Sequence, residues 1–211
     1  MKKILTPQYQ EKHPEKQIRA YYNENFIRVY QAYSDEIADS AVSNNTFVSP
    51  PFKMARMTWI KPSFFWMMYR AGWANKDDKQ KRILAIDITH EGFLWALSNS
   101  CPSSFKSDIF TSYEQWQKQK ENSPVRIQWD PERDFRLNKL DHRAIQIGLT
   151  GQAVHKYTQD WIVNITDITT LAQQIKTLID NDKIDQALQL VPKEQVYNLP
   201  SALAAKLTIT N

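Results

Sequence analysis

The chain has 211 residues, of which 42% are hydrophobic and 24% are charged, and its formal net charge is +4 at pH 7. This length suits one globular domain with a substantial core, while four glycines exclude a glycine-rich phosphate loop and one cysteine excludes an intrachain disulfide or a cysteine-based zinc site. Four histidines without helical metal-ligand spacing predict no metal site, and the lack of a signal peptide and of an apolar run of about 20 residues predicts a cytoplasmic protein outside the membrane.

The predicted elements begin after a polar arm at residues 1–17. Strand predictions rest on period-two alternation, as at Ile27 and Val29, and helix predictions rest on caps such as Ser34. The expected strands are 18–22, 26–32, 56–60, 82–88, 125–129, 144–149 and 161–165, and the expected helices are 34–45, 62–72, 93–97, a segment around Trp116, 169–179 and 184–190. This order predicts a single α+β domain over residues 18–200, with a mixed β-sheet that could be split, flanking and C-terminal helices, and a C-terminal tail at 201–211.

Residues 56–73 hold the densest group of large apolar side chains, with three Trp, two Phe, one Tyr and three Met around Arg56, Lys61 and Arg70. Such bulk favours burial, and a buried cation needs a carboxylate, a phosphate or an aromatic face beside it. Pro62 suits the first turn of a helix, whose free N–H groups would meet an anion together with Lys61 and Ser63. The segment is therefore predicted to line a site for a flat or anionic ligand. The alternative is that Ser63 only caps the helix and Lys61 only extends to solvent.

Basic residues are concentrated around the same segment. Eight basic and two acidic residues lie between positions 53 and 82, so this window is more positive than the whole chain. A local basic field beside aromatic side chains suits a nucleotide or a nucleic acid. For the run at 76–82, a solvated turn between buried elements is an equally good interpretation.

Candidate residues outside this segment are fewer. Arg28 lies in the middle of a predicted strand, where it would be either a clamp for a phosphate or carboxylate or a rim arginine facing solvent. His90 and Glu91 follow a buried strand and could act as acid or base, although an ordinary turn is the simpler interpretation. Gln152 lies in a predicted loop at 151–160 and could bind an amide or the edge of a base.

Three stretches carry a resemblance to a known family. They are VYQAY at 29–33, RMTWIKPSF at 56–64 and WMMYRAGW at 66–73. On these motifs the chain resembles the bacterial and fungal family called DUF4291, over about residues 17–200. That resemblance implies no activity.

The order of candidate residues is also similar to that of the ADP-ribosyltransferase superfamily. That resemblance implies a split mixed sheet, with Arg28 on the first strand, Thr58 or Ser63 on a following one, and Gln152 in a loop before a late strand. It implies NAD as the cofactor and Arg28, Thr58 and Gln152 as catalytic residues. The family's late-strand Glu has no counterpart here, where only Gln152, Asp160 or Asp167 is available.

These observations lead to one main hypothesis and two alternatives. The main one is a nucleotide-binding enzyme that transfers ADP-ribose from NAD to a nucleic acid or a nucleotide. Its cofactor would be bound by Arg56, Lys61, Ser63, Trp66 and Arg70, with Arg28 and Arg56 on one face. The alternatives are a non-catalytic RNA- or DNA-binding module that uses the same basic and aromatic surface, and a structural protein whose aromatic segment is core.

Overall fold

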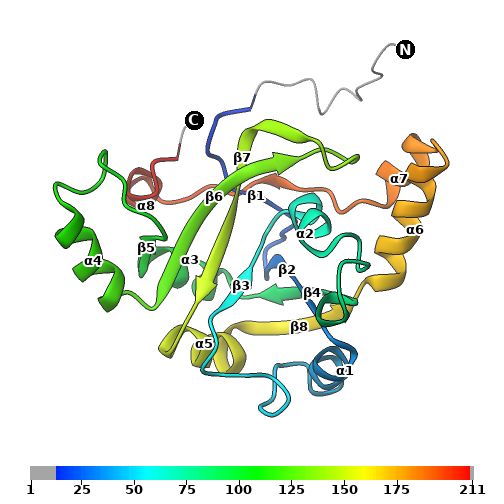
Figure 1. The fold of residues 1–211 in the computed structure, drawn as a ribbon, viewed down its shortest axis with the longest axis horizontal. Helices are drawn as coiled ribbons and strands as arrows, with labels where there is room; N and C mark the ends of the chain where they lie inside the picture. The colour runs from blue at the N-terminus through cyan, green and yellow to red at the C-terminus, as the bar shows by residue number, and fades with distance from the viewer. Residues whose placement is uncertain (1–12, 210–211) are drawn as a thin grey trace.

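The computed structural model describes residues 13–209, which build helices around three β-sheets (Figure 1). The strands are β1 (Arg19–Ala20), β2 (Ile27–Tyr33), β3 (Thr58–Ile60), β4 (Arg82–Ile88), β5 (Ser100–Pro102), β6 (Val125–Arg133), β7 (Lys139–Leu149), β8 (Ile162–Asp167) and β9 (Gln195–Val196). The helices are α1 (Asp35–Asn44), α2 (Phe64–Ala71), α3 (His90–Ser98), α4 (Tyr113–Asn122), α5 (Gln152–Lys156), α6 (Thr169–Asp180), α7 (Ile184–Leu190) and α8 (Ser201–Lys206). The predicted α+β class is confirmed.

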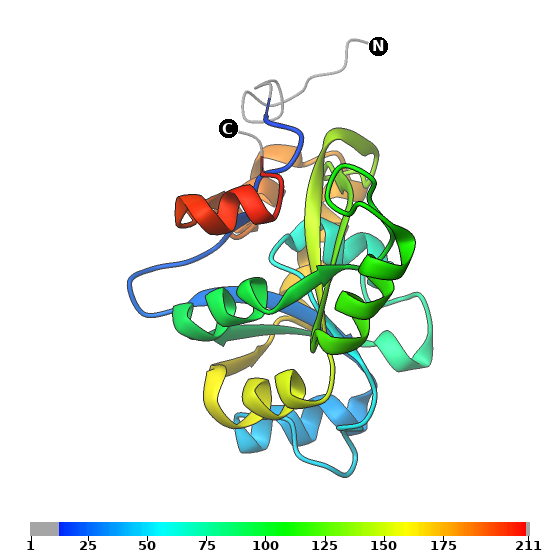
Figure 2. The ribbon, with the colours of Figure 1, turned by 90° about the vertical axis from the view of Figure 1, so that its left-hand side faces the viewer.

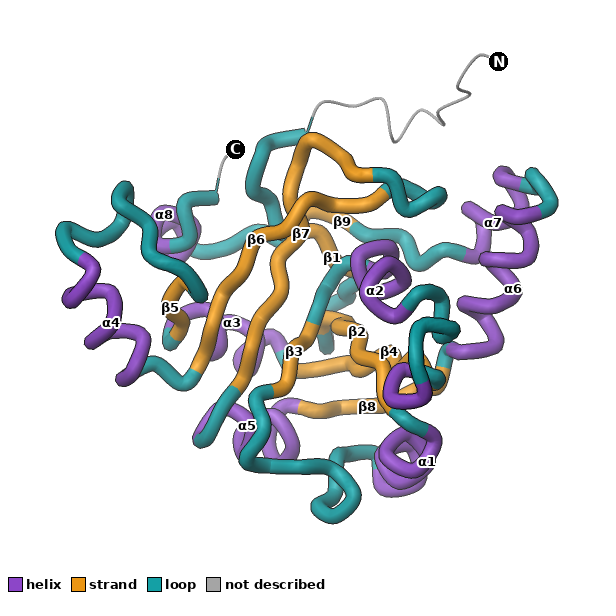
Figure 3. Tube along the Cα trace, in the orientation of Figure 1, coloured by secondary structure: helices purple, strands orange, loops and turns teal. Residues whose placement is uncertain are grey.

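The two larger sheets are separate and meet where β2 passes β3. One sheet has the antiparallel order β2-β4-β8, and the other has the mixed order β3-β7-β6-β5, in which only the β5–β6 pair is parallel. The Tyr30 N–H donates to the Lys61 carbonyl at 2.8 Å and joins the sheets at this point. Figure 3 shows β4 and β8 running across the view while β6 and β7 run steeply through it. This junction places residues from distant parts of the sequence around Lys61.

Strand β4 is buried on both of its faces, which explains its continuous apolar sequence. Leu84 and Ile86 pack into a core shared with the four-stranded sheet. Ile83 and Ala85 point the other way, into a second core with apolar residues of α2, α6 and α7. The three-stranded sheet is therefore the central layer of the molecule.

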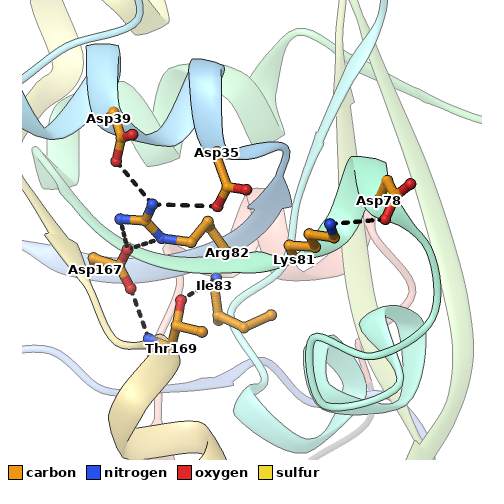
Figure 4. A network of polar contacts seen from close by, with 8 residues as sticks. All are labelled: Asp35, Asp39, Asp78, Lys81, Arg82, Ile83, Asp167 and Thr169. Atoms are coloured by element: carbon orange, nitrogen blue, oxygen red, sulfur yellow. Dashed lines mark hydrogen bonds and ion pairs between the residues drawn. The ribbon is translucent and has the colours of Figure 1, made fainter.

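A group of charged residues fastens β4 to its neighbours (Figure 4). Arg82 contacts Asp167 of β8 at 2.5 Å, and it contacts Asp39 and Asp35 of α1 at 2.8 and 3.4 Å. The second carboxylate oxygen of Asp167 accepts from the N–H of Thr169, at the start of α6. Asp167, one of the available late-strand acids, thus has a structural role, and its pKa is lowered by these hydrogen bonds despite its partial burial.

Helix α2 has the local signals that the sequence predicted. The side chain of Ser63 caps its start by accepting from the Trp66 N–H at 3.1 Å. Gly72 ends it in the left-handed conformation, with φ of 55°. Because both ends are fixed by neighbouring residues, the predicted helix at 62–72 is confirmed.

Other segments differ from prediction. The expected loop at 151–160 forms α5 and a π-helical turn (Tyr157–Trp161), because Ala153, Val154 and Tyr157 make a helical apolar stripe that is fully buried. Strand β6 continues through Pro131 to Arg133 instead of ending at 129.

The two ends of the chain also bear on the predicted domain limits. Residues 201–206, placed in the expected tail, form α8, and Leu203 and Leu207 pack into the main core. The predicted arm at 1–17 lies mostly outside the described residues. Within its described part, Arg143 donates its backbone N–H to the carbonyl of Glu15 at 2.8 Å.

Candidate functional site

The four-stranded sheet has one apolar face and one polar face. Strand alternation turns Ile60 and Ile147 into the core and turns Trp59 and Lys61 to the other side. Gln128 pairs with Gln146 across β6 and β7 on that second side. We call this surface the polar sheet face, and its residues are Trp59, Lys61, Arg126, Gln128, Asp130, Gln146 and Gly148.

Lys61 is the most unusual residue of the polar sheet face. It is 7% exposed, and its Nζ donates one hydrogen bond, to the Trp59 carbonyl at 3.1 Å. Among the described residues it forms no ion pair with a carboxylate. Burial lowers the pKa of Lys61 to about 7, the charge of Arg70 adds to this, and Asp130 opposes it. A buried ammonium without a paired carboxylate is costly, so an anion brought to this place would be strongly favoured.

The nearest acid, Asp130, is committed to other partners. Its two oxygens accept from the carboxamides of Gln128 at 2.9 Å and Gln146 at 2.6 Å. These two bonds orient both carboxamides on the sheet beside Lys61. Asp130 therefore moderates the charge of Lys61 without pairing with it.

Helix α2 borders this face with aromatic rings and cations. Trp66 stacks on Tyr69 with ring centroids 5.2 Å apart, and the guanidinium of Arg133 lies 3.7 Å from the Tyr69 ring centroid. Trp66 is buried, and neither its Nε1 nor the Nε of Arg133 has a hydrogen-bond partner within residues 13–209. Both atoms are donors, so this border lacks acceptors. Buried donors of this kind call for an acceptor from elsewhere.

The floor of the polar sheet face is flat where Trp59 crosses β7. A side-chain carbon added at Gly148 would lie 3.0 Å from the indole of Trp59 and from the sulfur of Met57. The Trp59 ring therefore rests directly on the backbone of Gly148, and a larger residue there would displace it. We use the name Lys61 site for the polar sheet face together with Trp66, Tyr69, Arg70 and Arg133.

Three of the predicted ligand-binding residues belong to the Lys61 site. Lys61, Trp66 and Arg70 come together because Trp66 and Arg70 are one helical turn apart on α2. Arg56 is exposed in the loop before β3 and lies near Tyr33. Burial raises the pKa of that tyrosine, and the charge of Arg56 partly offsets the rise.

Two predicted catalytic residues are not part of this surface. Thr58 points into the core, where it accepts from Gln31 at 2.6 Å and bonds the Tyr33 hydroxyl at 2.8 Å. Tyr157 completes this buried polar group by donating to Gln31 at 2.9 Å. Gln152 is exposed at the first position of α5.

Arg28 is occupied by a partner from its own chain. It forms two hydrogen bonds with Asp87 of β4, at 2.7 and 2.9 Å, and its guanidinium lies over the ring of Tyr21. Desolvation works against the charge of Arg28, but Asp87 outweighs it and the pKa of Arg28 is raised. Arg28 was expected to bind a phosphate or carboxylate of a ligand, but Asp87 of the same chain already occupies its guanidinium. Alternation along β2 also places Arg28 on the face opposite Tyr33 and its neighbour Arg56.

The predicted anion site at the start of α2 is likewise filled from within. The N–H of Phe64 donates to Glu194 at 2.6 Å, so a carboxylate of the chain meets the positive end of the helix. Glu132 lies close to it beside Ser63. Burial raises the pKa of Glu132 to about 7, and burial together with the charge of Glu132 raises the pKa of Glu194 well above its usual range. Ser63 therefore belongs to this carboxyl pair, not to an external ligand.

His90 has a structural role. Its Nδ1 bonds the hydroxyl of Tyr197 at 2.8 Å and its Nε2 bonds the carbonyl of Asn23 at 2.7 Å. Because both ring nitrogens are hydrogen-bonded, the contacts favour an ordinary turn residue over an acid or base.

Gln128, Asp130, Gln146 and Arg133 were not among the residues predicted from the sequence. A signal was present, since Arg126, Gln128 and Asp130 are polar at alternate positions of β6, and the residues between them, Ile127 and Trp129, are apolar. Extending that period-two pattern beyond residue 129 would have predicted a polar face.

Residues 13–209 were also searched for a metal site and for a membrane-spanning helix. They contain no group of three or more His, Cys, Asp or Glu side chains arranged to hold a metal ion. No helix in that range combines the length and apolar character needed to cross a lipid bilayer.

Fold and site together define an α+β protein with two separate sheets and a cationic, aromatic surface over one of them. Residues 17–197 match the model of the family described as "Domain of unknown function (DUF4291)", and the chain belongs to this family. A search of curated proteins finds no match to the sequence.

Proposed function

We propose that the Lys61 site binds an anionic ligand that carries a flat ring, and that a nucleotide is this ligand. The observation that carries the proposal is the buried ammonium of Lys61, which has no carboxylate partner among the described residues. The unpartnered donors of Trp66 and Arg133 add to it, because phosphate oxygens are acceptors. Trp59 would supply a ring face for a base, whereas the ring of Tyr69 is already contacted by Trp66 and Arg133.

The protonation of Lys61 gives this binding a measurable signature. With a pKa of about 7, Lys61 is only partly protonated at neutral pH. An anion beside it favours the charged form, so binding above pH 7 takes up a proton from solution. Calorimetric titrations at pH 8 in buffers of different ionisation enthalpy measure that uptake, and Lys61→Met removes it.

Transfer of ADP-ribose from NAD is the more specific form of the proposal, with a nucleic acid or a nucleotide as acceptor. In that reaction the bond between nicotinamide and ribose breaks, the acceptor attacks the ribose carbon, and nicotinamide leaves. The two separate sheets agree with the split sheet that the resemblance implies, whereas Arg28 and Arg56 lie on opposite faces and not together as the main hypothesis required. Since Arg28 and Thr58 have internal partners, Lys61 and Arg70 would hold the diphosphate.

Thermal shift of the full chain tests binding, with NAD, ATP, GTP and short RNA or DNA as probes. Lys61→Met is the test variant, and Lys176→Met is a matched control because Lys176 pairs with Asp180 on the exposed side of α6. Stabilisation by a nucleotide that only Lys61→Met abolishes supports the proposal. A shift with oligonucleotides alone, lost at high salt, favours the nucleic-acid-binding module. No shift with any probe overturns both.

Release of nicotinamide from NAD, followed by chromatography, tests the reaction separately. Binding of NAD without release of nicotinamide in the presence of an acceptor would leave the nucleotide site standing and remove the transferase assignment.

A further inference from the structure

A cavity of about 230 Å³ lies at the β5 edge of the four-stranded sheet, whereas Lys61 follows the β3 edge. Its walls come from β5 and the loop after it, from β6, from α8 and from the N-terminal stretch around residue 16. Figure 2 shows α8, in red, near the point where this stretch enters the fold. Pro102, Ile127 and Leu207 give the cavity an apolar part.

The polar part of the cavity is positively charged. Four cationic side chains line it, against two carboxylates, and they are Lys16, Lys106, Arg143 and Lys206, with Glu15 and Asp108. Glu15 is paired with Arg143 at 3.1 Å. Apart from that pair, Lys106 and Lys206 line the cavity together with the carboxylate of Asp108, and Lys16 donates to the Thr208 hydroxyl at 2.9 Å.

Lys106 and Lys206 are the cations available to a ligand. Neither forms an ion pair with a carboxylate in the described part of the chain, and Lys206 donates only to the carbonyl of Ser98. Lys206 is exposed to solvent over much of its side chain, and burial of the remainder lowers the pKa of Lys206, which is a modest cost to its charged form. An anion in the cavity would relieve that cost.

The volume limits what this anion can be. A cavity of about 150 Å³ is enough for benzene, whereas pockets for drug-sized ligands have about 300–1,000 Å³. At about 230 Å³, the space holds one ring with one charged group and is too small for a dinucleotide. It is therefore not a second copy of the proposed nucleotide site.

We propose that this cavity binds a small cyclic anion, with its ring against Ile127 and Leu207 and its carboxylate or phosphate at Lys106 and Lys206. Gln128, which belongs to the Lys61 site, also lines this cavity, but the proposal is carried by Lys106 and Lys206 and does not depend on the function proposed for the Lys61 site. The two possible head groups share one chemistry, and the choice of probes separates them.

Calorimetric or ligand-observed NMR titration of the full chain tests it, with benzoate, phenyl phosphate and the neutral benzyl alcohol as probes. We expect the better anion to bind at least ten times more tightly than benzyl alcohol. Whichever of benzoate and phenyl phosphate binds more tightly identifies the head group. Equal binding of benzyl alcohol, or no binding of either anion at 10 mM (about the weakest useful affinity), would overturn the proposal.

Three variants locate the bound probe. Lys106→Ala, in an exposed loop, and Lys206→Met should each weaken anion binding at least threefold, while Lys176→Met should leave it unchanged. Ser103→Phe fills the cavity without removing a charge and should block both anions. Anion binding that persists in Ser103→Phe, with folding confirmed by circular dichroism, would place the probe elsewhere on the protein.

Discussion

Two cations, one at the start of β4 and one just after β3, have opposite surroundings in this fold. Arg82, at the start of β4, is 27% exposed at its side chain and has three carboxylates around it. Lys61, just after β3, is 7% exposed and has one carbonyl. Arg82 could have been stabilised by solvent even without its carboxylates. Lys61 is shielded from solvent and needs an anion, which residues 13–209 do not provide. The difference separates a cation that holds the structure together from one that is poised for a ligand.

The largest effect on stability is expected from Arg28→Ala. Arg28 is a third case beside Arg82 and Lys61, because it is partly buried and paired with a carboxylate. Arg28→Ala leaves the carboxylate of Asp87, 5% exposed at its side chain, without its partner. Loss of one member of a buried pair costs about 3 kcal/mol or more of unfolding free energy. Urea denaturation measures it. The double variant with Asp87→Leu should recover most of the loss, and failure to do so would mean that Arg28 acts through its packing on Tyr21.

Arg82→Ala should have the next largest effect. It removes contacts that join β4 to α1 and β8, but solvent reaches the remaining carboxylates, so we expect a loss of about 1–2 kcal/mol. The same denaturation experiment on Lys81→Ala is the control, since its pair with Asp78 lies on the surface and should have no measurable effect. Equal losses in the two variants would show that the Arg82 network is no more than a surface ion pair.

The pH dependence of stability separates Lys61 from the carboxyl pair. Folding lowers the pKa of Lys61 from 10.5 to about 7, so the unfolded chain binds more protons between these values and stability rises with pH there. Folding raises the pKa of Glu132 from 4.5 to about 7, so its contribution falls as pH rises through that window. Each slope is at most about 1.4 kcal/mol per pH unit for one proton.

Difference profiles between wild type and variant isolate these two slopes. Lys61→Met should remove the rise above pH 7, and Glu132→Gln should remove the fall below it together with the part of the raised Glu194 pKa that the charge of Glu132 causes. Subtraction is needed because burial lowers the pKa of His142 to about 4, and this group acts in the same acidic window with the opposite sign. A Lys61→Met profile parallel to wild type above pH 7 would show that Lys61 is solvated in the folded protein.

The smallest effect on stability, and the sharpest contrast with Arg82, is expected from Lys61→Met itself at pH 7. Replacing an unpaired buried cation by an apolar side chain of similar length should stabilise the protein by about 1 kcal/mol. The same variant should lose nucleotide binding. A loss of stability of similar size would mean that the ammonium has a structural partner.

Helix α2 is the part of the Lys61 site that local sequence determines. Ser63 and Gly72 fix its ends, and the spacing of Trp66 and Arg70 puts both on one side, so the sequence alone brought part of the Lys61 site together. These signals act within a few residues and are independent of the remainder of the fold. The alternating polar residues of β6 carried equally local information.

The partners of the charged groups were decided only by the tertiary structure. Asp87 is 59 positions from Arg28, and Glu194 is 130 positions from the N–H of Phe64 that it accepts from. No local pattern shows which carboxylate reaches which cation, because strand order and register determine it. The sequence determined that cations and aromatic rings gather near α2. The tertiary structure decided that Arg28 and the start of α2 are satisfied internally while Lys61 is not, because one carboxylate cannot neutralise two distant groups and burial makes the unpaired one costly.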